Sequence, residues 1–223
     1  TTQALGDLAR LKRDSFAGQV IAVTGSSGKT SVKEMIAAIM RERVMVHATK
    51  GNLNNHIGVP LTLLEMDDQC DIAVIEMGAS AAGEITYLCS LAQPDVAVIN
   101  NIQRAHIEGF GSIEAIAAAK SEIFGGLKPS GIAILNLDEI YAKQWLELIG
   151  ERQYISFSVD DSSADIFAKD IKALGNGCYG FILCVGEIAG TTPAEQAVEL
   201  PHPGIHILSN ALAAAACALA AGA

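Results

Sequence analysis

From Val20 to about Gly150, the chain alternates between short apolar runs and longer segments with helically spaced apolar residues. The apolar runs predict strands at Val20–Thr24, Val44–His47, Ile72–Glu76, Val96–Asn100 and Ile132–Asn136. The intervening segments predict helices at Lys29–Arg43, Val59–Met66, Ala82–Leu91, Ser112–Phe124 and Glu139–Ile149. Strands that are apolar on both faces and joined by helices indicate a parallel sheet covered on both sides. Right-handed crossovers bring the carboxyl ends of such strands to one edge, where ligands bind.

The pattern changes after about residue 150. Three short runs, Tyr154–Val159, Asp165–Ala173 and Tyr179–Val185, are separated by polar turns, and Gly175-Asn176-Gly177 is a hairpin signal. These runs predict a small antiparallel sub-sheet, followed by a loop with a short strand over Gly186–Glu199 and a last helix over Ile205–Ala221. The predicted fold class is therefore α/β, a P-loop three-layer fold with a mostly parallel sheet and a small antiparallel sub-sheet.

Two regions bear on domain organisation. Residues 1–18 have a partial apolar face and are expected to be a lead-in from a missing N-terminal domain of a longer protein, with residues 19–223 forming one domain. The segment Leu200–Ala223 lacks Asp, Glu, Lys and Arg, but it contains two prolines and two histidines. It therefore predicts a buried helix rather than a membrane span.

The composition narrows the function classes. Half of the residues are hydrophobic, which supplies ample core, and the net charge of −10 argues against non-specific binding to nucleic acid or anionic membranes. The five cysteines show no CxxC spacing, and the segment Thr1–Asp7 has neither the basic nor the apolar region of a signal peptide. We expect free thiols and a cytoplasmic protein.

The segment Val20–Ser31 carries the strongest chemical signal. A buried strand ends in the turn Gly25-Ser26-Ser27-Gly28, and Lys29-Thr30-Ser31 opens a helix. Glycines let backbone N–H groups converge on an anion at the positive end of a helix dipole. Lys29 would reach the β- and γ-phosphates and Thr30 would bind Mg²⁺. Val23 replaces the first glycine of the Walker A pattern, so the segment has the shorter TGxxGKT form. The alternative interpretation is a glycine turn that only joins the strand to the helix.

Two further residues follow predicted strand ends. Glu76 closes a buried strand and is followed by Met77-Gly78, the position of a carboxylate that holds Mg²⁺ directly or through water. The alternative is a helix cap or a solvated strand end. His106 lies in a polar, glycine-rich loop after the next strand, where a metal ligand and a structural histidine are both compatible with the pattern.

Lys120 and two amide-rich stretches complete the candidates. From the residues alone, Lys120 in a helix is expected to be a solvated charge. Asn52, Asn54 and Asn55 follow a strand and suit recognition of a polar substrate, with turn formation as the alternative. Asn210 lies in the second stretch, Gly204–Leu212, near the start of the last predicted helix.

The chain resembles the Mur ligases of peptidoglycan synthesis, and among them the D-alanyl-D-alanine-adding ligases. The resemblance rests on Thr24–Ser31, Gly51–Asn55, Ile57–Pro60, Val74–Gly78, His106–Ser112 and Ala119–Phe124. It covers about residues 1–223, which would correspond only to the central ATP-binding domain. The resemblance implies an N-terminal domain that grips the UDP-sugar and a C-terminal domain that closes over ATP, and both are expected to lie outside these 223 residues.

The resemblance implies roles for the candidate residues. Gly25 to Ser31 would bind ATP, with Lys29, His106 and Lys120 catalytic. Thr30 and Glu76 would serve one Mg²⁺, and Glu76 with His106 a second. Lys120 would be carbamylated, because a carbamate can ligate or orient a metal that an ammonium would repel. Asn210 would contact adenine, although Ile207 replaces the first asparagine of that motif.

The implied reaction is ATP-dependent amide formation between UDP-MurNAc-tripeptide and D-Ala-D-Ala through an acyl phosphate, with this domain alone expected to be inactive. One alternative is a P-loop nucleotide-binding regulatory module, which would not need His106 and Lys120. Another is a related amide ligase such as folylpolyglutamate synthase, against which the segment with Asn52, Asn54 and Asn55 argues.

Overall fold

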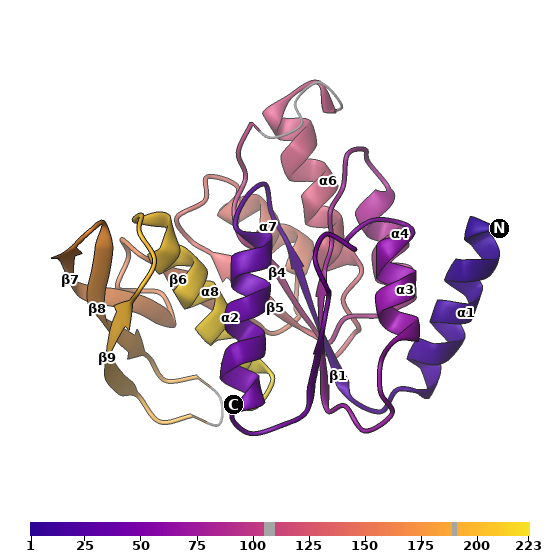
Figure 1. The fold of residues 1–223 in the computed structure, drawn as a ribbon. Coiled ribbons are helices and arrows are strands. Elements are labelled where there is room, and N and C mark those ends of the chain that lie inside the picture. The colour runs from indigo at the N-terminus through magenta and orange to yellow at the C-terminus, as the bar shows by residue number, and fades with distance from the viewer. Residues whose placement is uncertain (105–109, 189–190) are drawn as a thin grey trace.

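The computed structural model describes residues 1–104, 110–188 and 191–223. They form one nine-stranded sheet that has helices packed on both faces (Figure 1). The strand order is β2-β3-β1-β4-β5-β6-β7-β8-β9. The strands are β1 (Gln19–Thr24), β2 (Val46–Ala48), β3 (Ile72–Glu76), β4 (Val96–Ile99), β5 (Ile132–Asn136), β6 (Tyr154–Ser158), β7 (Ile166–Gly175), β8 (Cys178–Val185) and β9 (Ala194–Leu200). The predicted α/β class is confirmed.

Seven helices of the described chain cover the two faces of the sheet. They are α1 (Thr2–Ser15), α2 (Lys29–Arg41), α3 (Gly58–Leu64), α4 (Glu84–Ala92), α6 (Ile113–Gly125), α7 (Ala142–Ile149) and α8 (His206–Ala220). The five helices and five strands predicted before residue 150 are all present, with ends shifted by at most three residues. The largest shift is at α7, where the side chain of Glu139 instead accepts the Ile102 N–H at 3.0 Å.

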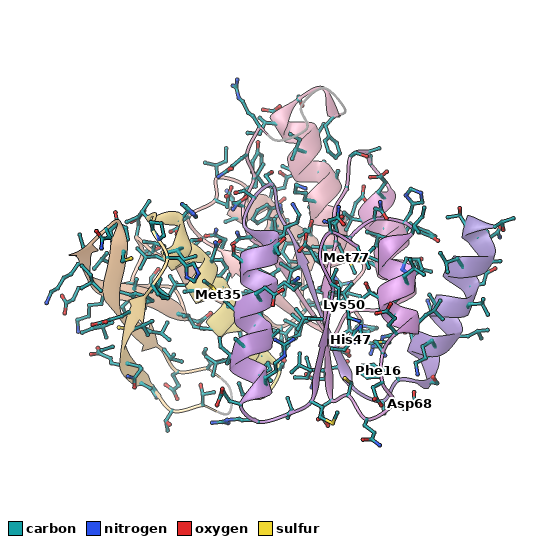
Figure 2. The ribbon with its side chains drawn as sticks, viewed as in Figure 1. Phe16, Met35, His47, Lys50, Asp68 and Met77 are labelled. Atoms are coloured by element: carbon teal, nitrogen blue, oxygen red, sulfur yellow. The ribbon has the colours of Figure 1, made fainter. Side chains whose placement is uncertain are left out.

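The strand residues alternate between two core layers. Val20 and Ala22 of β1 pack with α1, α3, α4, α6 and α7, whereas Ile21 and Val23 pack with α2 and α8. Because both faces are covered, each parallel strand near the centre is apolar at nearly every position. Figure 2 shows Phe16 and Met35, which belong to opposite layers.

The region after residue 150 differs from the predicted sub-sheet. β6 pairs in parallel with both β5 and β7, so the prediction that it belongs to an antiparallel sub-sheet is wrong. The physical reason is that α7 is a crossover helix, which returns the chain parallel to β5. The antiparallel part is limited to β7, β8 and β9, which extend the main sheet. The predicted hairpin turn is confirmed, with positive φ at Gly175, Asn176 and Gly177.

The two terminal helices are part of the domain core. α1 is the expected amphipathic segment, and its Arg13, 3% exposed, donates to the carbonyls of Ala92 and Gln93 at the end of α4. α8 lies buried against the sheet, as predicted from its apolar sequence. Within the described ranges, no helix combines the length and apolarity needed to cross a bilayer.

The sheet ends in two unlike edges. β2 is only three residues long, and it pairs with β3. β9 has seven residues, mostly exposed, and pairs with β8. β1 is the third strand in the order and is separated from the edge strand β2 by β3 alone. From β1 the chain runs to β2 and β3 on one side, and it then crosses to β4 on the other side. That reversal is where ligands bind in open parallel sheets.

Candidate nucleotide-binding site

The turn between β1 and α2 has a conformation that requires glycine. Gly28 is the residue before α2 and has φ of 72° and ψ of −1°. A Cβ at Gly28 would lie 2.6 Å from Nδ2 of Asn100 and 2.7 Å from Oδ1 of Asn210. The turn therefore packs tightly against two amides, and the first N–H groups of α2 point out of the helix end toward an anion site.

Two asparagines directly after β4, Asn100 and Asn101, form hydrogen bonds with the turn. Asn101 accepts the Ser27 N–H through Oδ1 and the Ser26 N–H through its carbonyl, both at 2.9 Å. Asn100 donates from Nδ2 to the Ser27 carbonyl at 3.0 Å and to Oδ1 of Asn210 at 2.7 Å. Sequence reasoning missed both roles, although consecutive asparagines directly after a buried strand are a usable signal.

Asn210 lies beside the turn between β1 and α2, residues 25–28, which we call the phosphate turn. Its side chain is 3% exposed and bonded to Asn100, and it comes from the first turns of α8. Oδ1 of Asn100 is buried without a hydrogen-bond partner among the described residues. The contact of Asn210 with adenine stays a prediction.

Lys29 and Thr30 face two different groups. Nζ of Lys29 donates to the Gly25 carbonyl at 3.0 Å, and burial lowers the pKa of Lys29 against an opposing attraction from Glu76. The hydroxyl of Thr30 donates to Oε2 of Glu76 at 2.9 Å. The end of β3 thus meets the start of α2, which is the arrangement predicted for a metal-binding carboxylate and hydroxyl.

Glu76 is buried, and its backbone N–H and both of its carboxylate oxygens are hydrogen-bonded. It is 2% exposed, its Oε1 accepts from Nδ2 of Asn54 at 2.8 Å, and its N–H donates to the Thr49 hydroxyl at 2.9 Å. The interpretation of Glu76 as a solvated strand end is therefore wrong. A carboxylate and a hydroxyl are hard oxygen donors, so the pair fits Mg²⁺ when phosphate oxygens and water complete the shell.

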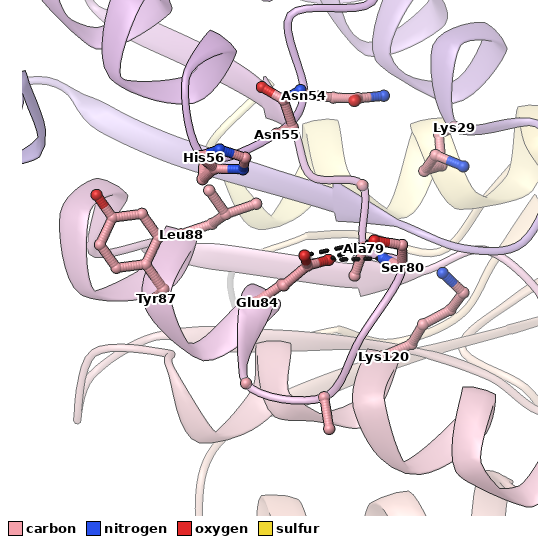
Figure 3. Close-up of a pocket in the computed structure, with 13 residues that line it drawn as sticks. Lys29, Asn54, Asn55, His56, Ala79, Ser80, Glu84, Tyr87, Leu88 and Lys120 are labelled. Carbon is pink, nitrogen blue, oxygen red and sulfur yellow. Dashed lines mark hydrogen bonds between the residues drawn. The ribbon is translucent and has the colours of Figure 1, made fainter. Parts of the chain in front are cut away.

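Lys120 is also buried. It comes from α6, is 3% exposed, and has its pKa lowered to about 8 by burial and by the nearby charge of Lys29. The expectation of a solvated helix lysine is wrong. Lys29 and Lys120 enter one cleft of about 650 Å³ from different elements (Figure 3).

The far side of this cleft is lined by His56, Ser80, Glu84 and Tyr87. Sequence reasoning did not single out these four residues. The carboxylate of Glu84 accepts the N–H groups of Ser80 and Ala81, which lowers the pKa of Glu84. The cleft therefore has two lysines at the end nearest the phosphate turn, and polar, acidic and aromatic side chains at the other end.

The three asparagines of the amide-rich segment, Asn52, Asn54 and Asn55, have different surroundings. Asn54 binds Glu76, whereas Oδ1 of Asn55 accepts the N–H groups of Ile57 and Gly58 and starts α3. Asn52 is exposed. Substrate recognition by these three asparagines stays a prediction.

His106 lies outside the described residues, so its predicted metal role is untested. In the described ranges, no group of three His, Cys, Asp or Glu side chains is arranged to hold a metal ion. The five cysteines Cys70, Cys89, Cys178, Cys184 and Cys217 are free thiols.

Comparison with known proteins agrees with this geometry. The model of the Mur ligase middle domain matches residues 23–218. The chain belongs to the Mur ligase family. This Mur ligase domain is 45% identical to the UDP-N-acetylmuramoyl-tripeptide–D-alanyl-D-alanine ligase of Escherichia coli (strain K12), covering 100% of the chain and 48% of that protein. It is 42% identical to the ligase of the same name from Haemophilus influenzae, with 47% of that protein covered.

Solved structures give the same result. MurF from Acinetobacter baumannii superposes on the whole chain with a TM-score of 0.91 at 40% identity, covering 47% of that chain. MurF from Thermotoga maritima in complex with ADP matches 95% of this Mur ligase domain and 48% of that chain, with a TM-score of 0.79 at 32% identity. A folylpolyglutamate synthase from L. casei, at 17% identity and a TM-score of 0.71, shares the fold alone. The chain spans about half the length of the curated relatives it matches.

Proposed function

We propose that the chain is the central ATP-binding domain of a cytoplasmic ligase that joins D-Ala-D-Ala to UDP-MurNAc-tripeptide in peptidoglycan synthesis. The relatives that carry this name, and the related MurF that holds ADP, support the assignment. The structural observation that carries the ATP and Mg²⁺ part of the proposal is the 2.9 Å contact of Thr30 with Glu76, which joins the phosphate turn to an acidic strand end.

Mg²⁺ would be held by Thr30 and Glu76, and it would supply charge neutralisation on the phosphates of ATP. The glycine turn and the first N–H groups of α2 would bind the phosphate oxygens. Lys29, which now donates to the Gly25 carbonyl, has the length to turn toward the β- and γ-phosphates. A second Mg²⁺ with His106 is an expectation from the family resemblance.

The proposed reaction has two steps. The terminal carboxylate of the tripeptide attacks the γ-phosphorus, the bond to the bridging oxygen breaks, and ADP leaves. The amine of D-Ala-D-Ala then attacks the acyl carbon, phosphate leaves, and the amine gives up a proton. Two anions must meet in the first step, and Lys29 together with bound Mg²⁺ would offset their repulsion.

Carbamylation of Lys120 is part of the proposal. Carbon dioxide adds to a neutral amine, and burial together with the charge of Lys29 favours the neutral form of Lys120. The product is an anion and releases one proton. A carbamate beside Lys29 would replace repulsion between two ammonium groups by attraction, and it would suit orientation of the metal.

We further propose that catalysis needs domains on both sides of this one, because the chain spans about half of its relatives. A 223-residue chain alone is then expected to bind nucleotide weakly and to form no amide. Ile207 stands at an asparagine position of the family motif, so the proposed contact with adenine is assigned to Asn210 alone.

The test is ligation by the full-length protein with ATP, Mg²⁺, UDP-MurNAc-tripeptide and D-Ala-D-Ala. Formation of ADP and the pentapeptide product, with a hydroxamate trapped by hydroxylamine when D-Ala-D-Ala is omitted, is expected. Binding of ATP without hydroxamate or amide product would favour a regulatory nucleotide-binding module. Addition of glutamate to a folate instead would favour the folylpolyglutamate synthase alternative.

A further inference from the structure

The carboxylate of Glu76 has a different partner on each oxygen. Oε2 accepts from the Thr30 hydroxyl at 2.9 Å, on the side of the phosphate turn. Oε1 accepts from Nδ2 of Asn54 at 2.8 Å, on the side of the β2–α3 segment. The torsion that rotates a glutamate carboxylate is soft, so these two partners determine the plane of the carboxylate and keep one of its oxygens directed at the turn.

Asn54 is itself fixed by its backbone. Its carbonyl accepts the Gly78 N–H at 2.8 Å, and its N–H donates to the Asn52 carbonyl at 2.8 Å. A Cβ at Gly78 would lie 2.9 Å from Oδ1 and 3.0 Å from Cγ of Asn54. Glycine at position 78 therefore leaves the space that the Asn54 side chain occupies.

The start of the same segment is anchored to α2 and to β3. The ammonium of Lys33, which is fully buried, donates to the Thr49 carbonyl at 2.6 Å. Thr49 in turn donates its N–H to the Val74 carbonyl at 3.0 Å and accepts the Glu76 N–H through its hydroxyl at 2.9 Å. The segment that carries Asn54 is thus tied to the strand that carries Glu76.

We propose that Asn54 is a positioning residue, which holds Oε1 of Glu76 so that Oε2 faces Thr30 and the metal position. This inference rests on the proposed function, since it concerns the carboxylate assigned to Mg²⁺. An amide suits the task because it donates a hydrogen bond without cancelling the charge of the carboxylate, as an ammonium at 2.8 Å would. The role also differs from direct substrate contact, the role expected for Asn54 from the sequence.

The test compares full-length wild-type protein with Asn54→Ala, Gly78→Ala and the control Asn52→Ala. Asn52 belongs to the same segment but its side chain is exposed. Calorimetric titration with the non-hydrolysable analogue AMP-PNP, once with saturating Mg²⁺ and once with EDTA, gives the gain in affinity that Mg²⁺ provides. Loss of a group that orients a metal ligand weakens metal binding by about 10–100-fold.

We expect Asn54→Ala to reduce the gain from Mg²⁺ by about tenfold or more, with binding in EDTA unchanged. Gly78→Ala is expected to act in the same direction, because its methyl group displaces the Asn54 side chain, and Asn52→Ala is expected to match wild type. A wild-type gain from Mg²⁺ in Asn54→Ala would overturn the inference. Equal losses in Mg²⁺ and in EDTA would also overturn it, since they would indicate a merely structural role.

The outcome for wild-type protein separates this inference from the proposed function. If wild-type protein binds AMP-PNP without any effect of Mg²⁺, the assignment of Thr30 and Glu76 to a metal fails, and Asn54 has nothing to position. If wild-type protein depends on Mg²⁺ and Asn54→Ala depends on it equally, only the positioning role fails.

Discussion

Replacement of Gly28 by alanine tests whether the phosphate turn depends on close packing or only on glycine conformation. Gly28 precedes α2 with a positive φ of 72°. Gly83 precedes α4 with a similar φ of 83°, but no atom lies within 4 Å of a Cβ built there. Alanine would therefore be in a strained backbone conformation at both positions, but its methyl group would meet neighbouring atoms only at Gly28. Gly83→Ala is thus the matched control.

The expected magnitudes follow from these contacts. A left-handed conformation costs an L-residue about 1–2 kcal/mol, and both variants carry this term. At Gly28 the new methyl group would also meet Asn100 and Asn210 at 2.6 and 2.7 Å, where their side chains are hydrogen-bonded to each other. Separation of a buried amide pair costs about 1–3 kcal/mol. Gly28→Ala should therefore lower the free energy of unfolding by about 2 kcal/mol more than Gly83→Ala.

Urea unfolding monitored by tryptophan fluorescence measures both values, because Trp145 is the single tryptophan and is 1% exposed. Trp145 packs against Phe124 in the layer opposite α2, so its signal reports global unfolding rather than movement of the turn. Equal destabilisation of the two variants, within about 0.5 kcal/mol, would refute the argument that the asparagine pair determines the need for Gly28.

Three further predictions concern α1, a histidine and Lys120. Arg13→Ala should lower the free energy of unfolding in urea by about 3 kcal/mol, because it leaves the carbonyls of Ala92 and Gln93 without their donor and removes one of the two cations paired with Asp95. Arg10→Ala should change it little, and equal effects would contradict this. Burial lowers the pKa of His47 in the folded state, so unfolded protein binds the proton more readily, and stability should fall as the pH drops below about 6.5. The urea midpoint should therefore fall between pH 7.5 and 5.5, and the fall should be smaller in His47→Gln; an identical fall would exclude His47 as its source. Lys120→Ala in the full-length protein should abolish hydroxamate trapping with an unchanged melting temperature, and trapping at the wild-type rate would remove the carbamate proposal.

The sequence predicts the central elements well because they are apolar on both faces. The bounds of β3 and β5 match the predicted Ile72–Glu76 and Ile132–Asn136, since a fully buried strand leaves an unbroken apolar run. The direction of β6 could not be read in this way. Its five residues resemble a hairpin strand, and only the packing of α7 as a crossover makes it parallel.

The site is predicted less completely, because its contacts join residues far apart in the chain. The phosphate turn and Glu76 are recognisable from short local patterns. The contact of Asn54 with Glu76 depends on the order β2-β3-β1, which sequence spacing does not reveal. Lys120 was misjudged for a related reason: α6 is rich in alanine and buried over much of its surface, so its polar positions do not mark the exposed face.

The unlike edges of the sheet have a consequence for how copies of this chain behave at high concentration. An unpaired strand invites another chain to add to it, and a three-residue edge such as β2 offers few places for such pairing. β9 is long enough to be a template, but it carries Glu195 and Glu199 on an exposed ladder. Lys169 of β7 pairs with Glu195 at 3.1 Å, so the charge of Glu199 is the one that a second copy added at this edge would meet without a partner.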